Sequence, residues 1–139
     1  MHKDDTDMVV CLREARARGY HRFFIAGCLG GRVCHTLANV QCAYDAALRG
    51  EEIWLCDETN MTTVLLPGTY TLQPPMDRFF SLLSYTPQVT GITLTGTEWP
   101  LEDAVLDNRF PLGVSNKVVS TPVTLSFRTG ALVLVYAMD

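Results

Sequence analysis

The sequence lacks an excess of positive charge, and this absence excludes one large class of partner. The 139 residues include 11 lysines and arginines against 15 aspartates and glutamates, so the net charge is −4. Proteins that bind duplex nucleic acid along its phosphate backbone carry a basic footprint. We therefore expect no nucleic-acid partner, although the cations present suffice for a local patch that binds one phosphorylated ligand.

The sequence also lacks a long apolar run. The longest such run near the C-terminus covers residues 131–138, whereas a membrane-spanning helix needs about 20 apolar residues. The first seven residues, Met-His-Lys-Asp-Asp-Thr-Asp, show no apolar core after a basic stretch, which a signal peptide would have. We expect a cytoplasmic protein that does not associate with membranes.

Paired cysteine motifs are missing as well. The 5 cysteines lie at positions 11, 28, 34, 42 and 56, and no two of them form a C-x-x-C pair. This odd number and spacing predict neither a zinc ribbon nor a complete disulfide framework. We interpret the cysteines as reduced thiols. Because 47% of the residues are hydrophobic and the net charge is small, the chain is expected to fold.

The first half of the chain predicts alternating helices and strands. Thr6 or Asp7 can cap a first helix, and Gly19 suits its end. Leu37, Val40 and Tyr44 recur at helical spacing and predict, with Leu48, one apolar face of a second helix. The expected elements are a helix from about residue 8 to 18, a strand at 22–26, a glycine loop at 27–32, a helix at 35–49 and a strand at 52–56. The strand, loop, helix and strand form a βαβ unit, which implies a parallel pair. Residues 1–66 are thus predicted to be a partial α/β domain with an incomplete parallel sheet.

The second half predicts strands alone. Short extended runs and turn signals follow Pro67-Gly68, with little helical periodicity. Residues 123–127 alternate apolar and polar side chains, and Thr129-Gly130 predicts a turn into a returning strand at 131–137. We expect residues 67–139 to form an all-β antiparallel sandwich domain, with the boundary near residues 58–68.

Three segments could carry chemistry. The first, Lys3-Asp4-Asp5-Thr6-Asp7, offers carboxylates suited to Mg²⁺, but it is also typical of a solvated acidic terminus that favours a helix dipole. The second, residues 27–32, reads Gly-Cys-Leu-Gly-Gly-Arg between a strand and a helix. Such a loop offers backbone N–H groups and an arginine to phosphate oxygens, or else serves a purely structural turn. It matches neither the dinucleotide fingerprint nor a P-loop.

The third segment combines Thr95-Gly96-Thr97-Glu98-Trp99-Pro100-Leu101 with Gly113-Val114-Ser115-Asn116 further on. An exposed tryptophan in a loop can stack on a flat or cationic ring. The same residue could instead fill one end of a sandwich. His35, at the start of the second helix, is either a ligand or proton carrier, or a hydrogen-bonded structural residue.

Together these segments resemble the bacterial type of thiamine pyrophosphokinase, also called thiamin diphosphokinase. That family shows K-D-x-T-D, then G-x-x-G-G-R-x-D-H-x-L-x-N, then T-G-x-x-W or T-G-x-x-Y followed by P-L, and finally G-x-S-N. The matching segments here are residues 3–7, 27–39, 95–101 and 113–116, in the same order across nearly the whole chain.

The resemblance implies a fold and a reaction. The family joins an α/β nucleotide domain to a β-sandwich, works as a homodimer with shared active sites, and transfers pyrophosphate from ATP to thiamine with Mg²⁺. It implies these roles in this chain: metal binding and catalysis by Asp7 and Asp4; nucleotide binding by Gly30, Gly31, Arg32, His35 and Asn39; thiamine binding by Trp99, Ser115 and Asn116. Trp99 would serve the partner subunit's site.

Two departures from the family pattern affect the expectation. Cys34 stands where the family has aspartate before histidine, and the upstream D-G-G and G-D-x-D-S segments are absent. We therefore expect a truncated chain that by itself turns over poorly or not at all. The alternative is a non-catalytic dimeric module that binds thiamine, or one that is purely structural.

Overall fold

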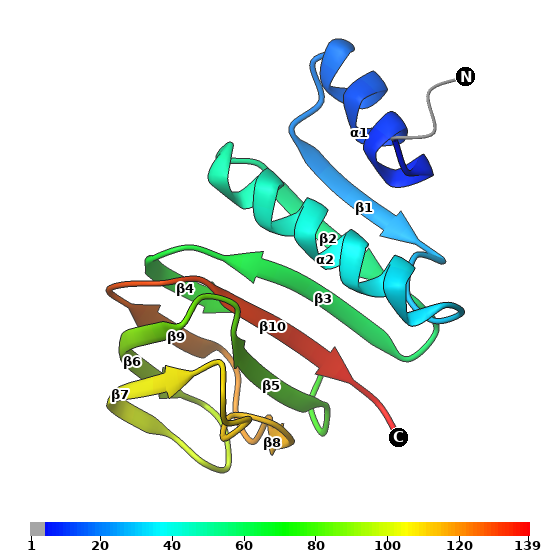
Figure 1. Ribbon diagram of the computed structural model, residues 1–139. Helices are drawn as coiled ribbons and strands as arrows, with labels where there is room; N and C mark the ends of the chain where they lie inside the picture. The colour runs from blue at the N-terminus through cyan, green and yellow to red at the C-terminus, as the bar shows by residue number, and fades with distance from the viewer. Residues whose placement is uncertain (1–4) are drawn as a thin grey trace.

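The computed structural model describes residues 5–139 and contains two helices and ten strands within that range (Figure 1). Neither helix is long and apolar enough to cross a membrane. The elements are α1 (Asp7–Ala17), β1 (Arg22–Ala26), α2 (Val33–Leu48), β2 (Glu52–Cys56), β3 (Asn60–Leu65), β4 (Gly68–Leu72), β5 (Phe79–Ser84), β6 (Gln88–Thr95), β7 (Leu101–Asp107), β8 (Asn116–Lys117), β9 (Val123–Phe127) and β10 (Leu132–Ala137).

The strands form two sheets rich in antiparallel pairs. A six-stranded sheet has the order β1-β2-β3-β10-β5-β8, and a four-stranded sheet has the order β4-β9-β6-β7. The helices pack beside the β1–β3 end of the larger sheet, while the smaller sheet packs against its β10–β5 end (Figure 1). The chain is therefore mostly β with two helices, and its second half is a β-sandwich as predicted.

Alternating side chains of β10 join the two hydrophobic cores. Leu132, Leu134 and Tyr136 belong to the core between the sheets, whereas Val133 packs against the core under the helices. Successive residues of a strand point to opposite faces, so one strand supplies both cores. Since β10 also pairs with β3, the larger sheet runs across the expected division between residues 66 and 67. That division into two domains stays a prediction.

The predicted βαβ unit is present. β1 and β2 pair in parallel, with Ala26 opposite Cys56, and α2 connects them. Parallel strands require a crossover connection, and here the helix supplies it. The glycine loop before α2 and the segment after β2 therefore lie at the same edge of the sheet, which places the site described below.

Helix α1 is fixed by a cap and an ion pair. Thr6 caps it by accepting a hydrogen bond from the N–H of Val9 at 3.3 Å, which decides between the two predicted caps. Arg16 donates to both carboxylate oxygens of Glu51, at 2.9 and 2.7 Å, and the Glu51 side chain is only 11% exposed. A bidentate pair of this kind constrains the angle as well as the distance, so α1 is held against the chain that enters β2.

The predicted apolar face of α2 is only partly correct. Leu37 and Leu48 are 62% and 59% exposed, whereas Ala43 and Ala46 are buried. Small side chains allow the helix backbone to lie close to the sheet, so the contact line follows the alanines. Helical spacing alone does not distinguish this line from the neighbouring one that carries the larger residues.

The predicted hairpin between residues 123–127 and 131–137 is wrong. β9 pairs with β4 and β6 in the smaller sheet, while β10 pairs with β3 and β5 in the larger one. Gly130, with φ of 88°, lies at the crossing, and a Cβ there would be 2.3 Å from the Gln88 carbonyl oxygen. The turn therefore passes the chain from one sheet to the other. Strand β7, which begins at Leu101, the last residue of the segment at 95–101, was not predicted.

Candidate functional site

The glycine loop between β1 and α2 needs its three glycines for backbone reasons. Gly27, Gly30 and Gly31 have φ values of 72°, 88° and 68°. Only glycine adopts this left-handed region without strain. A Cβ at any of the three would meet nothing within 4 Å, so backbone conformation, and not space, selects glycine here.

Hydrogen bonds from both flanking elements hold this loop. The Asn39 side chain donates to the Cys28 carbonyl oxygen at 2.7 Å, and the N–H of Gly27 donates to the Cys56 carbonyl at 2.9 Å. The Cys28 thiol donates to the Ile25 carbonyl at 3.1 Å, and burial raises its pKa. Asn39, predicted to bind nucleotide, therefore fixes the shape of the loop from within α2.

The N-terminus of α2 is open toward a ligand. Arg32 is the N-cap residue, but among the described residues no side chain caps this end. The first N–H groups of a helix need partners from outside it, and with the helix dipole they favour an anion. The Arg32 guanidinium contacts Nε2 of His35, so the two side chains stand together on the first turn. This arrangement can hold phosphate oxygens.

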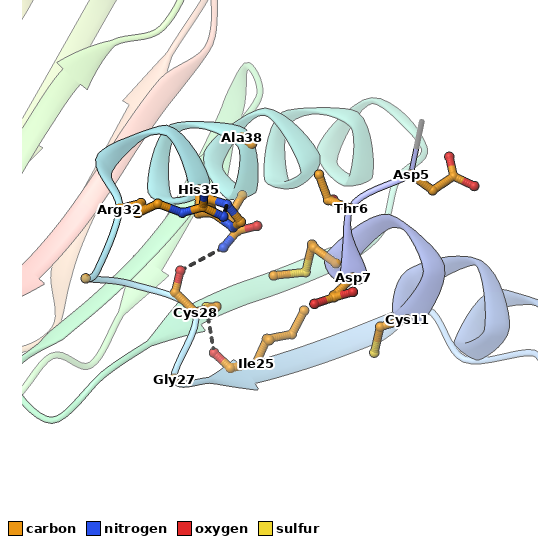
Figure 2. Close-up of a pocket in the computed structure, with 13 residues that line it drawn as sticks. Asp5, Thr6, Asp7, Cys11, Ile25, Gly27, Cys28, Arg32, His35 and Ala38 are labelled. Carbon is orange, nitrogen blue, oxygen red and sulfur yellow. Dashed lines mark hydrogen bonds between the residues drawn. The ribbon is translucent and has the colours of Figure 1, made fainter. Parts of the chain in front are cut away.

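A cleft of about 680 Å³ joins this loop to the start of α1 (Figure 2). The Asp7 carboxylate points from α1 toward the side of the cleft where α2 begins, and Arg32 and His35 stand on that side (Figure 2). The predicted residues that line the cleft are Asp7, Gly30, Arg32, His35 and Asn39. Gly31 belongs to the same loop without lining the cleft. Asp4, the other predicted metal ligand, lies outside the described residues.

The carboxylates at the cleft differ in their availability to a metal ion. Asp5 accepts a hydrogen bond from Arg13 at 2.7 Å and forms an ion pair with it, whereas Asp7 has no such partner within residues 5–139. The described residues hold no group of three or more potential metal ligands. Mg²⁺ is commonly held by one or two carboxylates together with substrate phosphates and water. Asp7 fits that pattern, because it faces the glycine loop at 27–32 and the start of α2. We call this loop and helix end the phosphate seat.

The tryptophan loop, residues 96–100 between β6 and β7, lies on the surface of the sandwich. It is far from the cleft in the sequence, and none of its residues lines the cleft. Trp99 is 66% exposed, which excludes the alternative that it fills the end of the core. Gly96, with φ of 90°, starts the loop, and a Cβ there would be 2.8 Å from the Ser120 carbonyl oxygen. An exposed indole held in a short loop can stack on a planar cation.

The Asn116 side chain uses its whole hydrogen-bonding capacity, and three of its four bonds hold this loop. Its side-chain oxygen accepts from the N–H groups of Trp99 and Lys117, both at 2.9 Å. Its amide nitrogen donates to the Trp99 carbonyl at 2.7 Å and to Thr97 Oγ1 at 3.2 Å. A side-chain amide offers two acceptor positions and two donors, and all four are used. A direct bond from Asn116 to thiamine would replace one of them, and it stays a prediction.

Ser115 precedes Asn116 in an unusual backbone conformation. Its φ is 64°, and its N–H donates to the Ser81 hydroxyl at 2.9 Å. The residue is exposed, and within residues 5–139 its own hydroxyl has no hydrogen bond. Ser115 and Trp99 therefore both present groups to solvent beside the Asn116 anchor. Trp99, Ser115 and Asn116 are absent from the lining of the cleft, so within one chain they lie apart from the predicted residues that line it.

One acidic residue near the cleft was missed by the sequence analysis. Asp57 directly follows β2 and accepts hydrogen bonds from the N–H groups of Thr59 at 2.8 Å and Asn60 at 2.7 Å. These bonds, first that from Thr59, lower its pKa. A signal existed, because a carboxylate directly after the second strand of a βαβ unit lies at the ligand edge of the sheet.

Known proteins similar to this chain are thiamine pyrophosphokinases, in agreement with the motifs in its sequence. The family described as thiamin pyrophosphokinase, vitamin B1 binding domain, matches residues 69–132, a range that contains Trp99, Ser115 and Asn116. A thiamine pyrophosphokinase of Bacillus subtilis (strain 168) is 29% identical over 138 residues, which is 99% of this chain and 64% of that protein. The chain thus spans slightly less than two thirds of the length of this curated relative.

Solved structures give the same result. The crystal structure of thiamine pyrophosphokinase from Bacillus subtilis matches with a TM-score of 0.93 and 28% identity, over 100% of this chain and 65% of that one. That of thiamin pyrophosphokinase from Geobacillus thermodenitrificans matches with a TM-score of 0.90 and 31% identity, over 100% and 64%. The chain therefore has the thiamine pyrophosphokinase fold. It is a relative of the bacterial thiamine pyrophosphokinases, which confirms the resemblance drawn from its motifs.

Proposed function

We propose that this chain carries substrate sites for pyrophosphoryl transfer from ATP to thiamine, which yields thiamine diphosphate and AMP. The observation that carries the proposal is the cleft in which Asp7, Arg32 and the open end of α2 converge. A carboxylate opposite a guanidinium and free N–H groups suits a metal-bound polyphosphate. We propose residues 1–66 as the nucleotide-binding part and the cytoplasm as the location. Free cysteines at all five positions support that location.

The residues of the cleft have separate tasks in this proposal. Arg32 and the N–H groups at the start of α2 bind phosphate oxygens, while Asn39 keeps the loop in the shape that presents them. His35 orients the Arg32 guanidinium through their contact. Asp7, and Asp4 by the resemblance, would hold Mg²⁺, which when bound neutralises charge on the transferring phosphates.

The reaction itself is an in-line displacement at phosphorus. The thiamine hydroxyl oxygen loses its proton to water and forms a bond to the β-phosphorus of ATP, the bond from that phosphorus to the oxygen bridging the α-phosphorus breaks, and AMP leaves. Charge in the transition state lies on phosphate oxygens, so positioned cations and N–H groups supply most of the catalysis. In this proposal, Arg32 and the N–H groups at the start of α2 bind those oxygens.

Thiamine would bind at the tryptophan loop. We propose that Trp99 stacks on its rings and that Ser115 offers the hydroxyl to its aminopyrimidine, while Asn116 keeps the loop in place. Because the tryptophan loop and the cleft are separate within one chain, we propose a homodimer in which Trp99 serves the partner's cleft.

A turnover assay tests the proposal. The purified chain is mixed with ATP, Mg²⁺ and thiamine, and AMP is followed with a radiolabelled nucleotide under single-turnover conditions. We expect AMP to form only when thiamine is present. The Arg32→Ala and Asp7→Asn variants should form AMP at least tenfold more slowly. Arg109→Ala, an exposed arginine in the sandwich, is the matched control. Thiamine binding without AMP, unaffected by Asp7→Asn, would instead indicate a non-catalytic binding module.

A further inference from the structure

A second hollow adjoins the cleft at the end of β2. It has a volume of about 600 Å³ and is lined by Ala26, Gly27, Asp57, Glu58 and Thr59. Gly27 lines both this hollow and the cleft that contains Arg32. A ligand seated at the glycine loop could therefore extend past Gly27 and reach the residues that follow β2.

The strand register fixes the relation between these two places. Ala26 and Cys56 are partners at the ends of β1 and β2, and the N–H of Gly27 donates to the Cys56 carbonyl at 2.9 Å. Because the strands are parallel, the glycine loop and Asp57 leave the sheet at the same edge. Ligands of open parallel sheets bind in the crevice outside these carboxyl ends.

The Asp57 carboxylate is held firmly and keeps one oxygen available. Oδ1 accepts from the N–H groups of Thr59 and Asn60, at 2.8 and 2.7 Å. The Asn60 side-chain nitrogen lies 3.2 Å from Oδ2, which has no other hydrogen bond within residues 5–139. An ionised carboxylate oxygen of this kind is a strong acceptor for hydroxyl groups.

The chain order of this region matches a general way of binding nucleotides. A strand leads through a glycine loop into a helix whose N-terminus faces phosphate, and a carboxylate after the next strand accepts the ribose hydroxyls. Here the order is β1, residues 27–32, α2, β2 and Asp57. We propose that Asp57 Oδ2 accepts a hydrogen bond from a ribose hydroxyl of the nucleotide, with the ribose in the hollow past Gly27. This inference rests on the phosphate seat of the proposed function.

Binding of sugar-modified nucleotides tests the inference without relying on turnover. Calorimetry with the 139-residue chain and Mg²⁺ compares ATP, 2′-deoxy-ATP, 3′-deoxy-ATP and inorganic tripolyphosphate. A hydrogen bond to a charged acceptor is worth enough that its loss weakens binding about tenfold. We expect at least one deoxy analogue to bind about tenfold more weakly than ATP, and the two analogues identify the hydroxyl that is recognised.

Variants assign the discrimination to Asp57. Asp57→Asn and Asp57→Ser keep an acceptor for the N–H groups of Thr59 and Asn60, and we expect each to remove the preference for ATP over the deoxy analogue. Asp107→Asn is the matched control, because Asp107 accepts from the Arg109 N–H at 2.7 Å in the other sheet. It is expected to keep the preference.

The outcomes separate the two proposals. If ATP binds and both deoxy analogues bind equally well, or if the Asp57 variants keep the preference, the ribose site is wrong while the phosphate seat stands. If neither ATP nor tripolyphosphate binds, the proposed function fails and the ribose site fails with it.

Discussion

The side-chain amide of Asn116 brackets the backbone of Trp99, accepting its N–H at 2.9 Å and donating to its carbonyl at 2.7 Å. Two residues separated by the whole of β7 are thereby joined at one point. The indole stays exposed while the backbone beneath it is fixed. A binding group that is already positioned loses less conformational entropy when it meets its ligand.

Removing this anchor should destabilise the sandwich. Asn116→Ala leaves the Trp99 N–H without its acceptor and removes the Asn116 donor from the Trp99 carbonyl and the buried Thr97 hydroxyl, and an unsatisfied buried polar group costs about 1–3 kcal/mol. We expect a loss of that size in urea unfolding. Asn108→Ala, on an exposed loop, is the control and should change stability by less than about 0.5 kcal/mol. Equal stability of the two variants would contradict the anchoring role.

Removing the indole should affect binding and leave stability almost unchanged. Trp99→Ala deletes a side chain that is mostly exposed, so the unfolding free energy should move by less than about 0.5 kcal/mol. Loss of stacking on a cationic ring, worth about 0.5–2 kcal/mol, should weaken thiamine binding from a few-fold to about thirtyfold. Calorimetry with thiamine measures this. Phe110→Ala, which removes an equally exposed ring, should bind as the wild type does, and a matching loss there would argue against a specific role of Trp99.

The glycine loop should resist any side chain at its left-handed positions. Gly31→Ala forces a left-handed φ of 68° on a residue with a Cβ, which costs about 1–2 kcal/mol or shifts the loop. We expect lower stability in urea and weaker ATP binding. Gly68→Ala is the control, because its φ is ordinary and its added Cβ would meet its nearest neighbour at 3.7 Å. Wild-type stability and ATP affinity in Gly31→Ala would contradict the role of the loop.

Restoring the carboxylate expected at position 34 should stabilise α2. The first turn of this helix contains no acidic residue, and a negative charge near a helix N-terminus contributes about 0.3–1 kcal/mol. Cys34→Asp should therefore raise the unfolding free energy, and added salt should reduce the gain. Cys34→Asn separates charge from hydrogen bonding, since it lacks the charge. A salt-independent gain shared by both variants would contradict the electrostatic explanation.

Acid unfolding should report on Asp57. Its pKa is lowered in the folded protein, so its ionised form adds stability at pH values above the unfolded pKa of about 3.9. This contribution is lost as the pH falls through the lower folded pKa. Asp57→Asn should therefore be less stable than wild type at neutral pH, and the difference should shrink below about pH 4. Urea unfolding at several pH values measures it, and a difference that stays constant to pH 2.5 would contradict the prediction.

Local patterns predicted the parts of the site that depend on few neighbouring residues. Glycines at 27, 30 and 31 indicated a loop, the short apolar run before them indicated a strand, and the helical spacing after them indicated a helix. The parallel pairing of β1 and β2 then followed from the helix between them. Helical spacing was less informative for α2, because it did not show that Ala43 and Ala46 lie closest to the sheet.

By itself, the sequence determined the βαβ unit, the glycine loop and the family resemblance, because each follows from backbone conformation, local periodicity or motifs in order along the chain. Only the tertiary structure decided that β9 and β10 lie in different sheets, and that three of the four side-chain hydrogen bonds of Asn116 hold the tryptophan loop. These relations join residues far apart in the chain. Strand pairing and polar satisfaction are settled by the partners that packing brings within reach, and no local pattern specifies those partners.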